Sequence, residues 1–227
     1  MIVHIPGVLT PDQVRHCNDV LGRAAWVDGR VTAGEQSGLA KRNLQVPEDA
    51  PEARALGDLI LKALANHPRF MSAALPLRVY PPLFNRYAKS MGFGDHIDNA
   101  IRISPVTGGR YRTDLSCTLF LTAPEQYGGG ELVIEGGLSP ERISLPAGDM
   151  ILYPATTVHR VEPITRGERW ASFFWIQSMV ADQTQRALLH DLDRAIVAVR
   201  GDLDDCHPAA VSLVGTYHNL LRMWSEV

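Results

Sequence analysis

The spacing of apolar residues divides the chain into three zones. The first, to about residue 75, places apolar side chains at helical intervals and predicts helices over about 11–25 and 51–66. The earlier helix begins with the capping box Thr10-Pro11-Asp12-Gln13, which satisfies free backbone groups at a helix start. The polar stretch 29–47 has no periodicity and is interpreted as a long loop.

The second zone, from about Leu77 to Ser178, alternates short β-prone runs with turn signals. Residues 113–122 alternate strictly, which places four apolar side chains on one face of a strand: Leu115, Cys117, Leu119 and Leu121. Further strands are expected at 142–145, 150–153, 159–161 and 169–176. Since no helix-length segment separates these runs, the pattern favours an antiparallel sandwich or barrel over a parallel sheet.

The third zone returns to helical spacing. It predicts one helix over 181–200, with Gly201 as its C-terminal cap, and a second over 209–224. This pair could pack on the β-core or form a subunit interface, so a homo-oligomer is one expectation. The zoning predicts a helical region 1–76, a β-core 77–178 and a helical region 179–227.

Composition excludes several classes of protein. The net charge of −3 argues against a nucleic-acid-binding partner, and no apolar run approaches the ~18 residues that a membrane span needs. The beginning of the chain lacks the pattern of a signal peptide. The three cysteines, Cys17, Cys117 and Cys206, form no C-x-x-C motif, which favours a reducing compartment. A cytoplasmic globular protein is therefore expected.

His96-Ile97-Asp98 is the first candidate for chemistry, because residues two apart on a strand point to one side. Alone it is weak evidence, since a chain with 8 His and 25 acidic residues should hold about one such pair by chance. His159, at the start of a predicted strand, would complete a site of two histidines and one carboxylate. That set is the facial triad of non-haem Fe(II) oxygenases. The alternative is a surface pair and a structural histidine.

Arg169 is the third element of the pattern. Residues 165–168 are interpreted as a hairpin turn, which would set Val161 opposite Arg169 and make His159 a diagonal neighbour of Arg169, about 7–8 Å away. A five-carbon keto dicarboxylate could span that gap, with its keto-acid end on the metal and its far carboxylate on the guanidinium. The alternative is a solvated hairpin arginine, a role that suits Arg166 better.

These residues resemble the motif of Fe(II)- and 2-oxoglutarate-dependent dioxygenases. Tyr87 resembles the tyrosine with which prolyl hydroxylases hydrogen-bond 2-oxoglutarate, and Trp175 matches their final strand. A closer resemblance is to the bacterial PKHD-type hydroxylases, the PiuC-like group linked to iron uptake. It covers nearly the whole chain and is carried by His4–Leu9, Trp26–Arg30, Pro82–Tyr87, Arg112–Ser116, Gly129–Val133, Leu145–Pro154 and Tyr217–Val227. Asn99-Ala100 departs from the Gly-Ala usual in that group.

The resemblance implies a fold and a reaction. The fold would be α+β, a double-stranded β-helix (jelly roll) with flanking N-terminal and C-terminal helices. His96, Asp98 and His159 would hold Fe(II), and Arg169 and Tyr87 would bind the cosubstrate 2-oxoglutarate. With O2, and with ascorbate as a further candidate cofactor, the protein would act as a hydroxylase that releases succinate. Its substrate would be a small molecule or a protein side chain.

Two other functions fit the same residues. One is a non-catalytic sensor that binds iron or 2-oxoglutarate on the same fold, and the other is a cupin-like hydrolase or isomerase using zinc. The Gly-rich loop Ser104–Gly109, flanked by Arg102, Arg110 and Arg112, is either a lid over an anionic substrate or an exposed loop. Arg112 and Asp114 are also interpreted as a structural ion pair.

Overall fold

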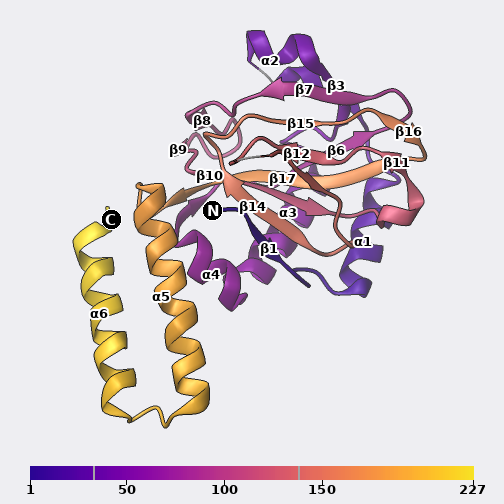
Figure 1. Ribbon diagram of the computed structural model, residues 1–227. Coiled ribbons are helices and arrows are strands. Elements are labelled where there is room, and N and C mark those ends of the chain that lie inside the picture. The colour runs from indigo at the N-terminus through magenta and orange to yellow at the C-terminus, as the bar shows by residue number, and fades with distance from the viewer. Residues whose placement is uncertain (33, 138) are drawn as a thin grey trace.

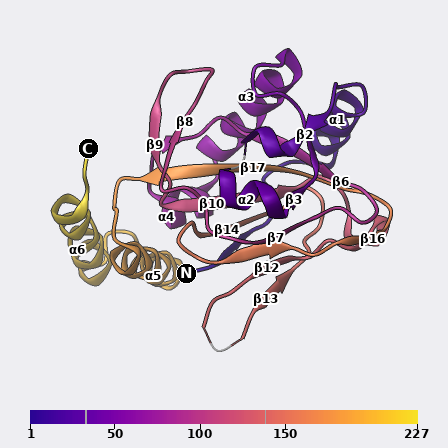
Figure 2. The same ribbon diagram turned by 90° about the horizontal axis from the view of Figure 1, so that it is seen from above.

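Two antiparallel β-sheets stack face to face, and helices cover the outer face of the larger sheet (Figures 1 and 2). The computed structural model describes residues 1–32, 34–137 and 139–227. The predicted α+β class and jelly-roll core are confirmed. Because the sheets face one another, side chains from both meet in the space between them.

The larger sheet contains, in spatial order, β1 (Val3–Ile5), β14 (Met150–Pro154), β10 (Leu115–Phe120), β17 (Arg169–Ser178), β6 (Leu83–Tyr87), β4 (Leu44–Gln45) and β2 (Val27–Asp28), with β5 (Pro76–Val79) also paired to β17. The smaller sheet contains β13 (Glu141–Ile143), β12 (Leu132–Ile134), β15 (His159–Val161), β7 (Gly92–His96) and β3 (Lys41–Arg42). Two short ribbons pair β8 (Ile101–Ile103) with β9 (Arg110–Arg112) and β11 (Gly128–Gly129) with β16 (Ile164–Arg166).

The central strand β10 separates two environments. Its alternate side chains Leu115, Cys117 and Leu119 pack into the apolar core beneath the helices, as the sequence pattern predicts. The side chains between them, Ser116 and Thr118, line the pocket between the sheets. One strand thus contributes to a dry core on one face and to a polar pocket on the other.

Three helices supply the other half of that core: α1 (Pro11–Leu21), α3 (Pro51–Ala65) and α4 (Pro68–Ala74). The capping box of α1 forms as predicted, with Thr10 Oγ1 accepting from the Gln13 amide. The helix ends at Leu21 and not near Ala25. The indole of Trp26 donates to the Leu21 carbonyl over 3.1 Å, which satisfies a carbonyl that further helix would otherwise have used.

The expected loop over 29–47 was wrong. This stretch contains a 3-10 turn (Gly29–Thr32), the short helix α2 (Glu35–Ala40) and strands β3 and β4. Strand β3 pairs with β7 of the smaller sheet, whereas β4 pairs with β6 of the larger one. The segment therefore links neighbouring edges of both sheets. Strands of two residues are too short to show a period, so the sequence pattern does not mark them.

The predicted hairpin between 159–161 and 169–176 was also wrong. Strand β15 lies in the smaller sheet and β17 in the larger, and β16 intervenes and pairs with β11. The predicted register of Val161 opposite Arg169 does not form, because Arg169 pairs with Tyr87. His159 and Arg169 nevertheless line the same pocket, from facing sheets.

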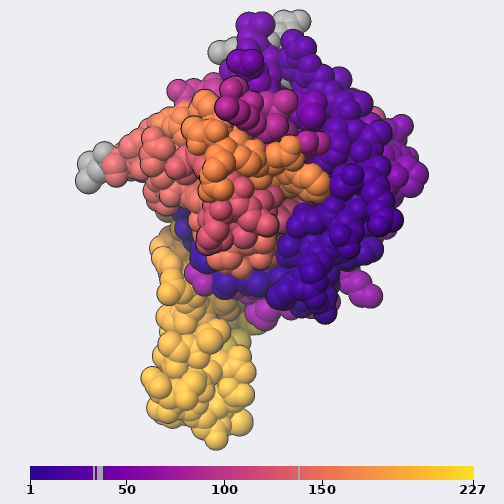
Figure 3. Space-filling view, turned by 90° about the vertical axis from the view of Figure 1, so that its right-hand side faces the viewer, coloured from indigo at the N-terminus to yellow at the C-terminus, as the bar shows by residue number. Residues whose placement is uncertain are grey.

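The chain ends in a long helical hairpin made of α5 (Gln183–Asp202) and α6 (Pro208–Trp224). It extends away from the sheets as a separate lobe (Figures 1 and 3). Gly201 lies inside α5, and the cap is Leu203, whose amide donates to the Val199 carbonyl. Among the described helices, none is both long enough and apolar enough to cross a bilayer.

The close approach of the backbone at Gly129 to Pro163 predicts how a substitution there changes the free energy of unfolding. Gly129 has φ +68°, and a Cβ there would lie 2.2 Å from the Pro163 carbonyl oxygen. Gly129→Ala should therefore cost more than the about 1–2 kcal/mol of left-handed backbone alone, as measured by urea unfolding. The control is Gly7→Ala. Gly7 has φ +63°, and a Cβ added there would have no described atom within 4 Å. Equal losses in both variants would contradict the clash.

Candidate active site

Three predicted ligands meet where two inner strands of the smaller sheet, β7 and β15, end and begin. His96 ends β7, Asp98 follows two residues later, and His159 begins β15 directly opposite His96 in the strand register. One nitrogen or oxygen atom from each lies within 4.8 Å of the others. His159 Nε2 and Asp98 Oδ2 are 3.7 Å apart. The spacing suits one divalent ion held on one side, with coordination positions left for other ligands.

Hydrogen bonds orient all three side chains. The Nδ1 atoms of His96 and His159 lie 2.8 Å and 3.0 Å from the carbonyl oxygens of Gly94 and Thr157, so each Nδ1 carries the proton and each Nε2 offers its lone pair. Ser116 on the facing sheet donates its hydroxyl to Asp98 Oδ2 over 2.6 Å. That bond also fixes Asp98 against the larger sheet. Sequence reasoning missed Ser116, because the contact crosses between sheets.

Aromatic rings flank both imidazoles. Phe93 stacks on His96 with ring centroids 3.5 Å apart, and Tyr153 meets His159 edge-on at 5.1 Å. Burial, and then the neighbouring His159, hold the pKa of His96 well below its usual 6.5. His96 is therefore neutral at physiological pH, which is the form that binds metal.

Arg169 is buried without a counter-ion. Its side chain is 1% exposed, and its Nε and Nη2 atoms have no hydrogen-bond partner among the described residues. The guanidinium lies 4.9 Å from the Phe120 ring centroid and 5.7 Å from that of Tyr87. Ring faces stabilise a cation only in part, so an anion in the pocket would find unsatisfied N–H donors here.

Tyr87 lies directly opposite Arg169 in the register of β6 and β17. It is buried, and burial raises the pKa of its hydroxyl, so the phenol stays protonated and can donate a hydrogen bond. Both residues line the same pocket as the His96, Asp98 and His159 cluster. Every site residue predicted from the sequence therefore lines the same pocket.

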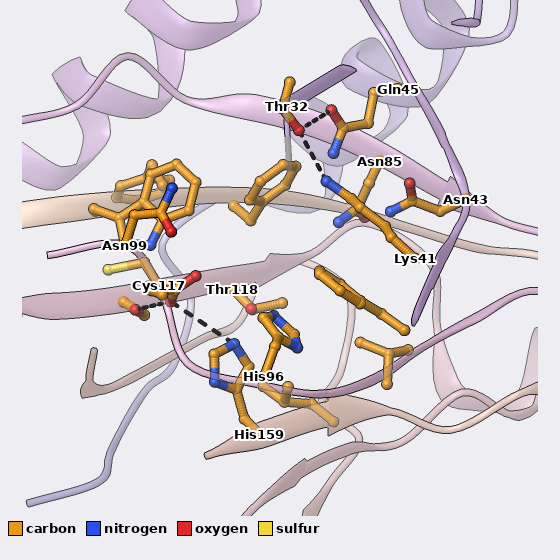
Figure 4. Close-up of a pocket in the computed structure, with 18 of the residues that line it drawn as sticks. Thr32, Lys41, Asn43, Gln45, Asn85, His96, Asn99, Cys117, Thr118 and His159 are labelled. Atoms are coloured by element: carbon orange, nitrogen blue, oxygen red, sulfur yellow. Dashed lines mark hydrogen bonds and ion pairs between the residues drawn. The ribbon is translucent and has the colours of Figure 1, made fainter. Parts of the chain in front are cut away.

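Polar residues that the sequence did not single out complete the lining (Figure 4). They are Lys41, Asn43, Gln45 and Asn85, with Thr32 at the rim. Asn43 Oδ1, Gln45 Nε2 and Asn85 Oδ1 have no hydrogen-bond partner within the described part of the chain. Burial, and then the charge of Arg102, lower the pKa of Lys41 to about 7. All of these polar residues except Asn85 belong to the stretch 29–47, which was expected to be a loop. That stretch has no periodic pattern that would have indicated them.

The loop Ser104–Gly109 is the tip of the β8–β9 hairpin. Arg102 on β8 reaches the pocket, whereas Arg110 is exposed. Arg112 pairs with Asp114 over 2.8 Å and with Glu226 over 2.9 Å, so the structural ion pair expected for it is confirmed. Of the three arginines that flank the loop, Arg102 is the one that faces the site.

Comparison with known families agrees with this geometry. Residues 82–177 match the 2OG-Fe(II) oxygenase superfamily, and residues 183–226 match the PKHD-type hydroxylase C-terminal domain. The chain is 59% identical to a PKHD-type hydroxylase of Gluconobacter oxydans, with all of both chains aligned. It is 52% identical to another from Paracoccus denitrificans, again with 100% of each chain covered.

Solved structures share the fold at low sequence identity. A Pseudomonas putida prolyl-4-hydroxylase aligns with a TM-score of 0.51 at 19% identity, over 78% of this chain and 92% of that one. HygX from Streptomyces hygroscopicus, solved with nickel, 2-oxoglutarate and hygromycin B, aligns with a TM-score of 0.53 at 17% identity, over 78% and 82%. These likenesses concern the fold alone.

The ligand cluster predicts how metal affinity responds to substitution. His159→Ala should abolish stoichiometric binding of a divalent metal, because two ligands remain of three. Ser116→Ala should weaken it about 10- to 100-fold by releasing Asp98. Chelator competition would measure both effects, with Ser144→Ala as the control, since that hydroxyl contacts Tyr127 instead. Full affinity in His159→Ala would show that this ligand is misassigned.

The depressed pKa of His96 predicts a pH dependence of stability in the metal-free protein. As pH falls below about 6.5, the unfolded chain binds a proton at His96 that the folded chain does not. The free energy of unfolding should therefore fall with pH, by up to about 1.4 kcal/mol per pH unit from this group. Urea unfolding in a chelator at pH 7.5, 6.5 and 5.5 measures it. His96→Gln should show a shallower slope, and identical slopes would refute the assignment.

Proposed function

The chain belongs to the PKHD-type hydroxylases of the 2OG-Fe(II) oxygenase superfamily, and from its pocket we propose a reaction coupled to 2-oxoglutarate. Enzymes of this superfamily use Fe(II), 2-oxoglutarate and O2. In the proposed reaction, 2-oxoglutarate, O2 and a substrate C–H group give succinate, CO2 and C–OH. One oxygen atom enters succinate and the other enters the substrate.

The donor set supports iron as the metal. Two imidazole nitrogens and one carboxylate oxygen suit ferrous iron, and their arrangement leaves positions for 2-oxoglutarate and O2. We propose that His96, Asp98 and His159 hold the ion, while Gly94, Thr157 and Ser116 fix their orientation. When bound, the iron supplies the oxidising power, and the protein supplies binding and position.

The unpaired guanidinium of Arg169 is the observation that carries this proposal. A dicarboxylate that reaches from the metal to Arg169 would satisfy the two nitrogen atoms that now have no partner. Tyr87 would add a hydroxyl donor beside it. A zinc hydrolase or isomerase on the same ligands has no need for such an anchor. Arg169 therefore favours the oxygenase over that alternative.

The proposal extends to the substrate that is oxidised. The resemblance to the PiuC-like group suggests a role connected with iron uptake, which would make a small molecule such as a siderophore fragment one candidate. A protein side chain is the other. The structure of HygX contains hygromycin B as well as 2-oxoglutarate, which illustrates that this fold accommodates a small-molecule ligand beside the cosubstrate. We propose a small-molecule substrate, since the site lies in a pocket between the two sheets.

The anchor predicts the effect of Arg169→Ala. The affinity for 2-oxoglutarate should fall at least about 30-fold, because losing one partner of a buried charge pair costs about 2–5 kcal/mol. Calorimetry with Mn(II) in place of iron measures this affinity, and metal affinity should survive. Arg166→Ala is the matched control, since that exposed arginine contacts the backbone carbonyls of Glu125 and Tyr127. Unchanged affinity in Arg169→Ala would remove the anchor assignment.

A further inference from the structure

We propose that Lys41 and Arg102 form a second anion-binding subsite, which binds a carboxylate of the substrate to be oxidised. The inference rests on the proposed function, in which a carboxylate of 2-oxoglutarate binds the guanidinium of Arg169. It adds a substrate class, a small organic carboxylate that also carries hydrogen-bonding groups. Three observations support it: the burial of Lys41, the setting of Arg102, and the distance of both from Arg169.

The amine of Lys41 is buried and has one hydrogen-bond partner among the described residues. Its side chain is 5% exposed, and its ammonium donates to Thr32 Oγ1 over 2.8 Å. Two rings lie beneath the charge, with Phe93 and Phe173 centroids at 5.3 Å and 5.8 Å. The Thr32 hydroxyl donates to Gln45 Oε1, so this contact supplies a neutral oxygen and no negative charge. A lysine ammonium has three N–H donors, and this single hydrogen bond satisfies one of them.

Arg102 approaches the same residue from the β8–β9 hairpin. Its Nη2 donates to the Thr32 backbone carbonyl over 3.3 Å, and its Nε has no partner. The guanidinium lies 4.0 Å from the Trp175 ring centroid and 5.5 Å from that of Tyr80. Two cations thus contact Thr32. Among the described residues no ion pair joins either cation to a carboxylate, and the more distant charges of Asp98, Asp28 and Glu48 offset the burial of Lys41 only in part. A bound anion would relieve their mutual repulsion.

This pair is separate from the cosubstrate anchor. Strand β17 carries Arg169 at its first position and Trp175, beneath Arg102, six residues later. Phe173, beside Lys41, is four residues from Arg169. At about 3.3 Å per residue, the positions of Phe173 and Trp175 lie roughly 13 Å and 20 Å from Arg169 along the strand. A five-carbon dicarboxylate cannot span either distance. In Figure 4, Lys41 lies with Thr32 and Gln45 in one part of the pocket, and His96 and His159 lie in another.

The surroundings limit what the subsite can hold. The subsite lies in a pocket between the two sheets that side chains of both sheets line, and such an enclosed site suits a small molecule. The amide groups of Gln45 and Asn85 have atoms without partners and could bind hydroxyl or amide groups of the same ligand. Phe173 and Trp175 supply flat apolar surface between the two cations.

The buried amine of Lys41 lowers the stability of the folded chain. Burial and the charge of Arg102 lower its pKa to about 7, which reflects an unfavourable environment for the ammonium. An apolar side chain of similar length would fill the same space without that cost. Lys41→Met should therefore fold, and its Tm should rise by roughly 2–4 °C. A structural lysine would give the opposite change.

The direct test measures binding, so it does not depend on turnover. Protein loaded with Zn(II) and saturating 2-oxoglutarate is titrated with acetate, butyrate, phenylacetate and 4-hydroxyphenylacetate, each beside its primary amide. We expect at least one acid to bind, and to bind at least tenfold more tightly than its amide. Lys41→Met and Arg102→Gln should each weaken that acid at least tenfold. Lys62→Met, on an exposed face of α3, should leave it unchanged.

The affinity for 2-oxoglutarate is measured on the same samples and should stay within about twofold in all three variants. Three results would overturn the subsite: no acid in the series binds, acid and amide bind equally, or the two site variants bind the acid as wild type does. A large loss of 2-oxoglutarate affinity in Lys41→Met would assign Lys41 to the cosubstrate instead. Failure of the wild type to bind 2-oxoglutarate would count against the proposed function, and the acids would then be titrated without it.

Discussion

The burial of Arg169 without a partner is the constraint on which the rest of the site depends. A guanidinium keeps its charge at any physiological pH, so it cannot escape burial by losing a proton. Ring faces of Phe120 and Tyr87 and a rigid position at the start of β17 hold it in place. Among the described residues its Nε and Nη2 have no hydrogen-bond partner, so in the proposed function a carboxylate that binds in the pocket would satisfy them.

The stability that offsets the burial of Arg169 comes from the other face of the same strands. Along β17, Phe174 and Ile176 pack beneath the helices, while Phe173 and Trp175 line the pocket. The period of two therefore assigns packing and binding to opposite faces of one strand. Helices α1, α3 and α4 complete the apolar core away from the charges. Substitutions in the pocket can thus change affinity without removing the contacts that hold the sheets together.

The sequence predicted those features that depend on residue type or on hydrophobic periodicity within one segment. The alternation in 113–122 predicted the face of β10. Residue type and strand position made His96, Asp98, His159 and Arg169 candidates, and the resemblance to the dioxygenase motif made them a specific prediction. The sequence failed where the answer depends on which strands pair. The predicted hairpin placed His159 and Arg169 on one sheet, whereas they lie on facing sheets. Strands of two residues, such as β3 with Lys41, are too short to show a periodic pattern, so the sequence does not predict which strand they pair with.

The two proposed anion sites differ in origin as well as in position. Arg169 and Tyr87 sit on β17 and β6, in the middle of the larger sheet, whereas Lys41 and Arg102 sit on β3, at the edge of the smaller sheet, and on the separate β8–β9 ribbon. Central strands tolerate little change, because each pairs on both sides. Edge strands and ribbons can vary with less effect on the core. A fold built this way can keep one cosubstrate anchor while the recognition of the second substrate changes, since the residues that would select it lie outside the central strands.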